Sequence, residues 1–215
     1  WSLPLTVSSG VLVPRPETET VVEAVLAACA EFSPPPPKGP VIVDLCTGTG
    51  SIAIALAREL LDARIFATDI SRRALRIARA NAETHGVAHR ITFLRGNLWR
   101  AFDGVSPGGP ADLIVSNPPY IPSHDIETLM PEVLREPRRA LDGGPDGLRF
   151  HREIILAAPR RLRPGGFLLL EIGADQASAV RRLLEAGGSF EEWRVFRDLA
   201  GRDRVIAARR TASEE

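Results

Sequence analysis

The sequence predicts a doubly wound α/β fold, in which a mainly parallel seven-stranded sheet carries helices on both faces. From Val41 onward, short apolar runs alternate with segments of helical periodicity, as in repeated strand–helix–strand units. Polar or glycine-rich segments follow several of these apolar runs directly, at the sheet edge where such folds bind ligands. The length of 215 residues is sufficient for one domain of this kind with a full core.

The composition restricts the function classes. Lys and Arg together number 27, as do Asp and Glu, so the net charge is zero and no basic excess indicates a polyanionic partner. The two cysteines, Cys29 and Cys46, lack the paired spacing of a disulfide framework or a zinc site, so we expect no metal. No apolar run approaches the roughly 18 residues that span a bilayer. We therefore expect a cytoplasmic protein that contacts no membrane.

The first segment, residues 1–16, is expected to form a β-hairpin. Apolar side chains alternate with polar ones from Trp1 to Val7, Ser8-Ser9-Gly10 provides a turn, and Val11–Val13 returns. Because the chain begins with Trp1 rather than Met, we expect a further segment before it.

The later elements follow from the same two periodicities. An acidic first turn, Glu17-Thr18-Glu19, suits the start of a helix that continues to about Cys29, and four prolines at 34–37 predict a rigid connector. Further strands are predicted at 41–45, 64–68, 91–94, 112–116, 167–171, 193–196 and 205–207. Further helices are predicted at 51–61, 71–84, 149–162 and 175–186. The last two strands have a hairpin-length connection, so the last should be antiparallel, whereas residues 121–148 predict an irregular excursion.

The tetrapeptide Asn117-Pro118-Pro119-Tyr120 follows the fourth strand and is the candidate catalytic segment. Both prolines have φ fixed near −65° and lack an N–H, so they offer carbonyl acceptors only. Asn117 precedes a proline and is therefore restricted to an extended conformation. The segment predicts a stiff edge of acceptors beside an aromatic ring. Such an edge suits a planar group carrying an NH₂, either a carboxamide or the exocyclic amine of a base.

A second polar segment, Asp44 to Gly50, follows the first strand of the sheet. Gly48 and Gly50 allow a tight turn and close backbone approach to a ligand, and the helix beginning at Ser51 directs N–H groups at that space. Asp69 ends the next strand, roughly 20 residues after Gly48, where a carboxylate can accept from ribose hydroxyls. The pattern predicts a nucleoside-type cofactor, although Gly48 to Ala53 also satisfies the dinucleotide fingerprint G-x-G-x-x-A.

Two features favour S-adenosylmethionine over a nicotinamide cofactor. Asp44 would repel a pyrophosphate but could pair with the cationic groups of the methionine moiety. Asn97 and Leu98 follow the third strand, where an amide and an apolar side chain can contact adenine. A nicotinamide oxidoreductase would also need a proton donor, and Tyr120 is the best candidate in the sequence. The candidate cofactor-binding residues are Asp44, Cys46, Thr47, Gly48, Thr49, Gly50, Asp69, Asn97, Leu98 and Asn117.

Three segments together resemble the HemK/PrmC family, the glutamine-N5 methyltransferases of peptide chain release factors. They are V-L-V-P-R-P-E-T-E at 11–19, the D-x-x-T-G-T-G loop at 44–50 and Asn-Pro-Pro-Tyr at 117–120. The last motif alone is similar to that of adenine-N6 methyltransferases, but its combination with the first is specific. The resemblance runs in order along essentially the whole chain.

The resemblance implies a class I S-adenosylmethionine-dependent methyltransferase fold. It also implies that residues 1–16 link the catalytic domain, 17–215, to a family helical N-terminal domain absent from this chain. The implied reaction transfers a methyl group from S-adenosylmethionine to the side-chain N5 of the glutamine in the Gly-Gly-Gln motif of release factors. S-adenosylhomocysteine would be the product. Arg15, Glu17 and Glu19 would border the substrate mouth, and we expect a monomer whose partner is a release factor.

Two departures from the family pattern affect the cofactor site. Cys46 replaces a glycine often found in the loop, and Asn97 stands where a carboxylate is common, which predicts weaker cofactor binding. Glu171, at the end of the fifth strand, is either a structural carboxylate or an active-site group. The single histidines His124 and His151 are expected to be solvated.

Other functions remain open at this point. An adenine-N6 or guanine-N2 methyltransferase acting on nucleic acid would use the same acceptor geometry for an exocyclic amine. A relative that methylates other proteins, or a non-catalytic S-adenosylmethionine-fold binding module, is also compatible with parts of the sequence. The intact Asn117–Tyr120 segment argues against the non-catalytic module, because such a module has no need of the acceptor edge.

Overall fold

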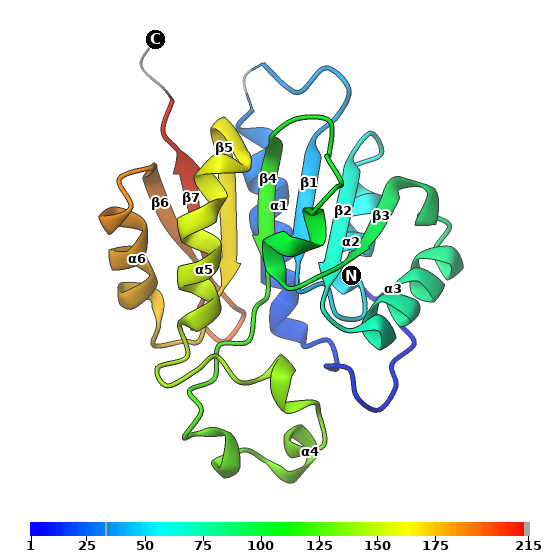
Figure 1. Cartoon of the computed structure of the whole chain (residues 1–215), viewed down its shortest axis with the longest axis vertical. Helices are drawn as coiled ribbons and strands as arrows, with labels where there is room; N and C mark the ends of the chain where they lie inside the picture. Colours follow the sequence, from blue (N-terminus) through cyan, green and yellow to red (C-terminus); the bar gives the residue numbers. More distant parts are fainter. Residues whose placement is uncertain (33, 213–215) are drawn as a thin grey trace.

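The computed structural model describes residues 1–32 and 34–212 and contains one seven-stranded sheet in the order β3-β2-β1-β4-β5-β7-β6 (Figure 1). The strands are β1 (Val41–Leu45), β2 (Arg64–Asp69), β3 (Ile91–Arg95), β4 (Ala111–Ser116), β5 (Leu162–Glu171), β6 (Phe190–Arg197) and β7 (Asp203–Arg210). The first five strands pair in parallel, and β7 runs antiparallel to both of its neighbours. This arrangement confirms the predicted α/β fold and its antiparallel last strand.

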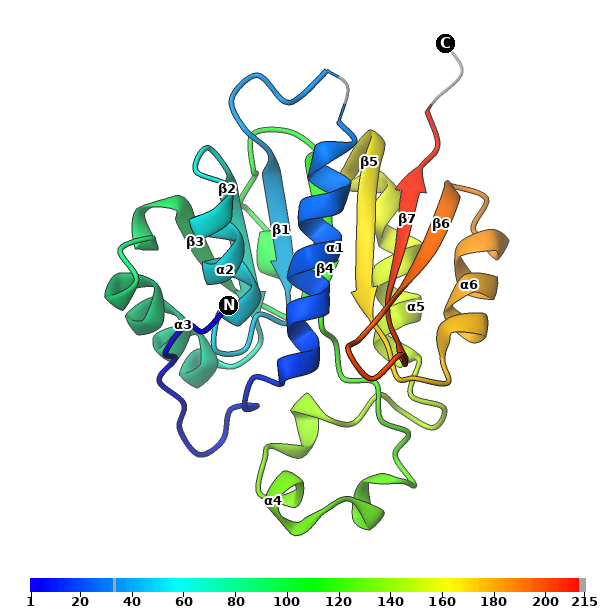
Figure 2. The same cartoon turned by 180° about the vertical axis from the view of Figure 1, so that it is seen from behind.

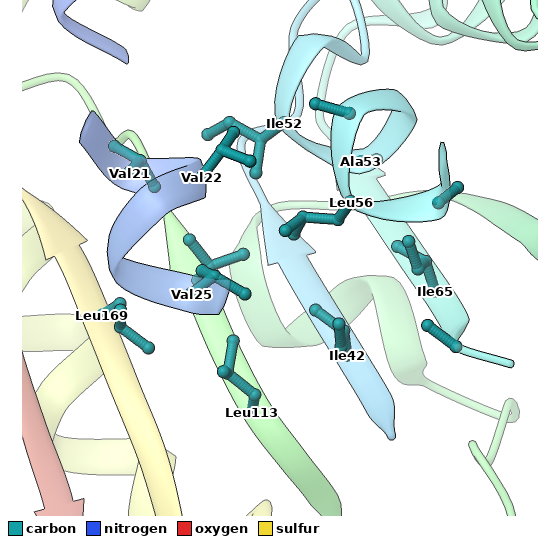
Figure 3. Packing of buried hydrophobic residues seen from close by; sticks show 14 of the residues in the cluster. Val21, Val22, Val25, Ile42, Ile52, Ala53, Leu56, Ile65, Leu113 and Leu169 are labelled. Carbon is teal, nitrogen blue, oxygen red and sulfur yellow. The ribbon is translucent and has the colours of Figure 1, made fainter. Parts of the chain in front are cut away.

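Helices cover both faces of the sheet (Figures 1 and 2). They are α1 (Glu19–Ala30), α2 (Ser51–Glu59) and α3 (Arg72–Thr84) on one face, and α5 (Arg149–Ala157) and α6 (Ala177–Ala186) on the other. Successive residues of β1 point to opposite faces of the sheet. Ile42 packs under α1 and α2, whereas Val43 packs in the hydrophobic cluster on the face covered by α5 and α6. Figure 3 shows Val25 of α1 and Leu56 of α2 lying over this first face. No helix in the described part of the chain is long and apolar enough to cross a membrane.

The N-terminal segment differs from the prediction. Residues 1–15 form an extended arm without strand pairing, so the predicted β-hairpin is wrong. The reason lies in α3, where the Asn81 side chain takes the place of a partner strand. The Thr6 N–H donates to Asn81 Oδ1 at 2.8 Å, and Asn81 Nδ2 donates to the Thr6 carbonyl at 3.1 Å. The arm therefore lies along α3 and brings its later residues, 10–12, to the carboxyl edge of the sheet.

Residues 121–148 form the excursion that the sequence left irregular. It contains short helical turns at Ile126–Thr128 and Arg138–Ala140 and the four-residue helix α4 (Pro131–Leu134). Its two ends meet, because Ile121 N–H donates to the Leu141 carbonyl at 2.9 Å and Gly143 N–H donates to the Ile121 carbonyl at 2.8 Å. In Figure 1 the excursion hangs below the carboxyl ends of the strands.

Gly147 lies where the excursion returns to the sheet, and its replacement should lower the stability of the protein. Its φ is +74°, and a Cβ there would lie 2.3 Å from the Tyr120 carbonyl oxygen and 2.6 Å from Gln176 Nε2. We expect Gly147→Ala to lower the free energy of unfolding by roughly 2–4 kcal/mol, through overpacking and backbone strain. Gly188→Ala is the matched control: its φ is +61° and its Cβ would meet no heavy atom within 4 Å. The control should lose only about 1 kcal/mol. Equal losses in urea denaturation would contradict the steric argument.

Candidate active site

A cavity opens at the carboxyl ends of β1, β2 and β4, where the strand order reverses on either side of β1. This is the position at which open α/β sheets bind ligands. Together with its open mouth, the cavity holds about 860 Å³ of space between the atoms. The predicted site residues that line it are Cys46, Gly48, Asp69, Asn97, Leu98, Asn117 and Pro119. Thr47, Thr49, Gly50, Pro118, Tyr120 and Asp44 do not line it.

The loop after β1 needs left-handed backbone at three positions. Cys46 has φ +61°, Gly48 +57° and Gly50 +84°. A Cβ at Gly48 would meet no heavy atom within 4 Å, so the backbone is open on that side. A Cβ at Gly50 would lie 3.1 Å from Ala78 Cβ on α3, so this glycine also allows α2 and α3 to pack closely. The thiol of Cys46 lies inside the fold, where burial raises its pKa, so it is an inert small side chain.

Asp69 ties this loop to the start of α3. Its Oδ2 accepts from the Gly48 N–H at 3.0 Å, and its Oδ1 accepts from the Ser71 N–H at 2.8 Å. Burial raises the pKa of Asp69, while these N–H donors and the charge of Arg139 act in the opposite direction. Both oxygens retain a lone pair at the cavity wall, which suits acceptance from ribose hydroxyls.

Asp44 lies beneath the loop and is fully buried. Its Oδ2 accepts from Thr47 Oγ1 at 2.6 Å, whereas its Oδ1 has no hydrogen-bond partner among the described residues. Burial raises the pKa of Asp44 to about 7, with the nearby Asp69 acting in the same direction. A buried, under-satisfied carboxylate favours a positive charge nearby, and the glycine loop above Asp44 separates it from the cavity.

The acceptor edge is held from behind. Asn117 Nδ2 donates to Thr18 Oγ1 at 3.3 Å, and no described residue donates to Asn117 Oδ1. The Tyr120 hydroxyl donates to Glu171 Oε1 at 3.4 Å, and the Tyr120 carbonyl accepts from Gln176 Nε2 at 2.8 Å. Burial raises the pKa of Tyr120 to about 12, so its phenol stays protonated at neutral pH. Asn117 thus keeps one free acceptor oxygen at the cavity.

The three predicted mouth residues lie on the segment that leads into α1. Arg15 Nη2 bonds Glu136 Oε1 at 2.7 Å, which connects this segment to the excursion. Glu17 is exposed, and its charge reaches Glu171. Glu19 is exposed.

Sequence reasoning missed several groups around the site. The arm residues Gly10 to Leu12, together with Arg139 and Phe150, line the cavity; Val11 and Leu12 belong to the motif at 11–19 but were not assigned to the site. Thr18 lies inside the Pro-Arg-Pro-Glu-Thr-Glu segment and could have been singled out there. Glu171, for which two readings were open, is buried and bonds Thr18 and Tyr120.

The two single histidines differ from each other. His124 is exposed, as expected, but His151 is fully buried, so the expectation of a solvated side chain was wrong. His151 lies on the inner face of α5, and its Nε2–H donates to the Glu171 carbonyl at 2.9 Å. Burial lowers the pKa of His151, so the ring is neutral. Within the described ranges, no group of three or more His, Cys, Asp or Glu side chains could hold a metal ion.

Comparisons with known proteins identify relatives of the chain. A family described as "Methyltransferase domain" matches residues 42–141. A release factor glutamine methyltransferase from Moorella thermoacetica is 46% identical over 97% of this chain and 71% of its own length. One from Gloeobacter violaceus is 45% identical over 95% of this chain and 68% of its own length.

A solved structure is similar as well. It is a release factor-specific protein-(glutamine-N5) methyltransferase from Alicyclobacillus acidocaldarius, 29% identical, with a TM-score of 0.56 over 96% of this chain and 99% of that one. The resemblance inferred from the sequence is confirmed: the chain belongs to the family of release factor glutamine methyltransferases.

Proposed function

We propose that the chain transfers a methyl group from S-adenosylmethionine to the side-chain N5 of the glutamine in the Gly-Gly-Gln motif of peptide chain release factors. Its family membership makes it an S-adenosylmethionine-dependent methyltransferase. The observation that carries the choice of acceptor is the free Asn117 Oδ1 at the cavity, on a segment whose prolines offer only acceptors. A carboxamide NH₂ complements such an edge, because it has two N–H donors to satisfy.

The residues of the cavity fit the cofactor. We propose that the loop Cys46–Gly50 lies against its methionine portion, Asp69 accepts from its ribose, and Asn97 with Leu98 contacts its adenine. The open space at Gly48 and the unpaired Asp44 Oδ1 suit a ligand that carries positive charge. When bound, S-adenosylmethionine supplies a methyl group activated by a sulfonium.

The contribution of the protein is orientation. An amide nitrogen is a poor nucleophile, because its lone pair is delocalised into the carbonyl. We propose that the Asn117 side-chain oxygen and the Pro118 carbonyl each accept one of its N–H bonds and hold the nitrogen in place. Well-oriented reacting groups gain up to roughly 7–11 kcal/mol from positioning. The Tyr120 phenol, protonated at neutral pH, packs beside the carboxamide and accepts no proton. The N5 proton therefore passes to water.

We further propose that Arg15, Glu17 and Glu19 contact the release factor at the mouth of the site. The bond from Arg15 to Glu136 supports this role, because it couples the entrance to the excursion that overhangs the cavity. Release factors act in the cytoplasm, so we place the reaction there, and we propose that a monomer carries it out.

The amide at position 97 gives a prediction about cofactor affinity. Asn97 lines the cavity, and its oxygen accepts without charge from the adenine amine in this proposal. Asn97→Asp should tighten S-adenosylmethionine binding roughly 3–10-fold, because charge-assisted hydrogen bonds are about twice as strong as neutral ones. Asn97→Ala, the control, should weaken binding. Calorimetric titration that finds no gain for the aspartate variant would contradict the adenine contact.

The proposed function is tested by offering the protein two substrates with S-adenosylmethionine, a release factor and adenine-containing DNA, and reading both by mass spectrometry. Methylation of the Gly-Gly-Gln glutamine supports the proposal. Methylation of the DNA alone overturns the substrate assignment. Cofactor binding without methylation of either would identify a binding module and overturn the proposal as a whole.

A further inference from the structure

Behind the acceptor edge, two buried groups that the proposed reaction does not use form a continuous chain with Asn117. Thr18 Oγ1 donates to Glu171 Oε2 at 3.0 Å and accepts from Asn117 Nδ2 at 3.3 Å. We propose that Glu171 and Thr18 are positioning residues that determine which end of the Asn117 amide faces the substrate. We call the three residues the polar relay. This inference rests on the proposed function, in which Asn117 must offer its oxygen.

The direction of each hydrogen bond in the polar relay follows from its first member. Above its pKa of about 7, for example at pH 8, Glu171 is an ionised carboxylate and can only accept, so the single hydroxyl hydrogen of Thr18 is committed to Glu171. The Thr18 oxygen then has only lone pairs left, and it can bind only the NH₂ end of the Asn117 amide. The oxygen end is thereby turned to the cavity that Asn117 lines. Without this constraint the two ends of the amide are nearly equal in shape, and its orientation would not be fixed.

The position of Thr18 supports a role other than helix capping. Thr18 is the last residue of the 3-10 turn Pro16–Thr18 that runs directly into α1, and its backbone is helical, with φ −67° and ψ −16°. A capping residue instead has an extended backbone, so the Thr18 hydroxyl is not placed to cap α1 and makes no capping bond. It is directed at Glu171.

Glu171 is itself held from three sides. The Tyr120 hydroxyl donates to its Oε1, the neutral His151 ring donates to its backbone carbonyl, and Thr18 donates to its Oε2. The charged groups that face it are Arg204 on β7, which favours the carboxylate, and Glu17, which opposes it. Only 1% of Glu171 is exposed, and burial raises its pKa to about 7.

A buried acid is a costly way to fill space, and a neutral glutamine of the same size would be cheaper. A glutamine, however, can either donate or accept, so it could reverse the Thr18 hydroxyl and with it the Asn117 amide. Only an acceptor-only group imposes one direction on the whole relay. The choice of glutamate at this position is therefore explained by the direction of the hydrogen bonds.

Four variants test the polar relay kinetically. Thr18→Val and Glu171→Gln should each lower kcat roughly 10–50-fold while KM for the release factor and the affinity for S-adenosylmethionine change less than about threefold, the effect of a hydrogen bond to a charged group. Thr18→Ser keeps the hydroxyl and should retain kcat within about threefold. The double variant should be no worse than the more damaged single variant, because both changes break one chain. Multiplying effects in the double variant, or an inactive Thr18→Ser, would overturn the proposal.

A second measurement separates the relay from the proposed function. The side-chain NH₂ resonances of Asn117, assigned in ¹⁵N-labelled protein by their loss in Asn117→Ala, report its bond to Thr18 directly. They should shift, and their hydrogens should exchange faster, in Thr18→Val but not in Thr18→Ser. Unchanged resonances in Thr18→Val would refute the relay. Shifted resonances in a protein that methylates no glutamine would refute the proposed function and leave the relay standing.

Discussion

Asn117→Ala is expected to lower kcat for methylation of the release factor glutamine by roughly 10²–10³-fold, the effect of removing one preorganised hydrogen-bonding group from an active site. The variant loses the acceptor oxygen that faces the cavity, while the Pro118 carbonyl remains. The amide nitrogen would then be held by one contact and could rotate away from the methyl group. Single-turnover methyl transfer with labelled S-adenosylmethionine measures this rate directly.

The same segment offers a control at Tyr120. Tyr120→Phe removes only the hydroxyl, whose bond to Glu171 is long at 3.4 Å and which does not line the cavity. We expect a loss below about tenfold for this variant, in keeping with one weak hydrogen bond. Asn117 otherwise bonds only Thr18 among the described residues, so Asn117→Ala should unfold at nearly the wild-type urea concentration. A kcat loss below tenfold in Asn117→Ala would remove the acceptor edge from the mechanism.

The strands of the sheet could be predicted because each is locally encoded. The runs at Val41–Leu45 and Ala111–Ser116 are mostly apolar and buried along almost their whole length, as expected for parallel strands that are covered on both faces. The glycine loop was equally visible, because left-handed backbone at Gly48 and Gly50 calls for a residue without a side chain. Local sequence carries both signals, except at Cys46, whose left-handed backbone no glycine announces.

The arm and the relay could not be predicted, because their partners are remote. Thr6 satisfies its backbone through Asn81, 75 residues away, so alternation in the arm alone could not show that no strand would pair with it. Thr18 and Glu171 are 153 residues apart and meet only once α1 packs over the end of β5. His151 similarly looked polar and exposed until the tertiary fold placed it under the Glu171 carbonyl. Periodicity predicts which face of a helix is buried, but it does not identify the polar group of another element that this face contacts.

The buried charge of Asp44 should lower the stability of the cofactor-free protein and strengthen cofactor binding. Asp44→Asn should therefore change these two properties in opposite directions. The folded pKa is about 7, whereas an aspartate in the unfolded chain titrates near its ordinary value of about 4. The folded state therefore holds the proton more tightly, and the wild type loses stability as the pH rises from about 4 to about 7. Asparagine carries no such charge, and its oxygen can still accept from Thr47. Without cofactor, Asp44→Asn should be more stable than the wild type at pH 8 by roughly 1–4 kcal/mol, with little difference at pH 4.

Cofactor binding should respond in the opposite direction. The same substitution removes the negative charge beneath the loop, so affinity for S-adenosylmethionine at pH 8 should fall at least about tenfold, as expected for a hydrogen bond or ion pair to a charged group. Glu171→Gln is the matched control, because Glu171 is also buried with a pKa of about 7 but lies at the end of β5, whereas Asp44 lies directly beneath the glycine loop that borders the cavity. Its cofactor affinity should stay within about threefold of the wild type.

Urea denaturation at both pH values and calorimetric titration at pH 8 measure the two effects. An Asp44→Asn protein that is less stable at pH 8, or that binds the cofactor as tightly as the wild type, would show that the charge of Asp44 is satisfied within the fold and is not reserved for the ligand.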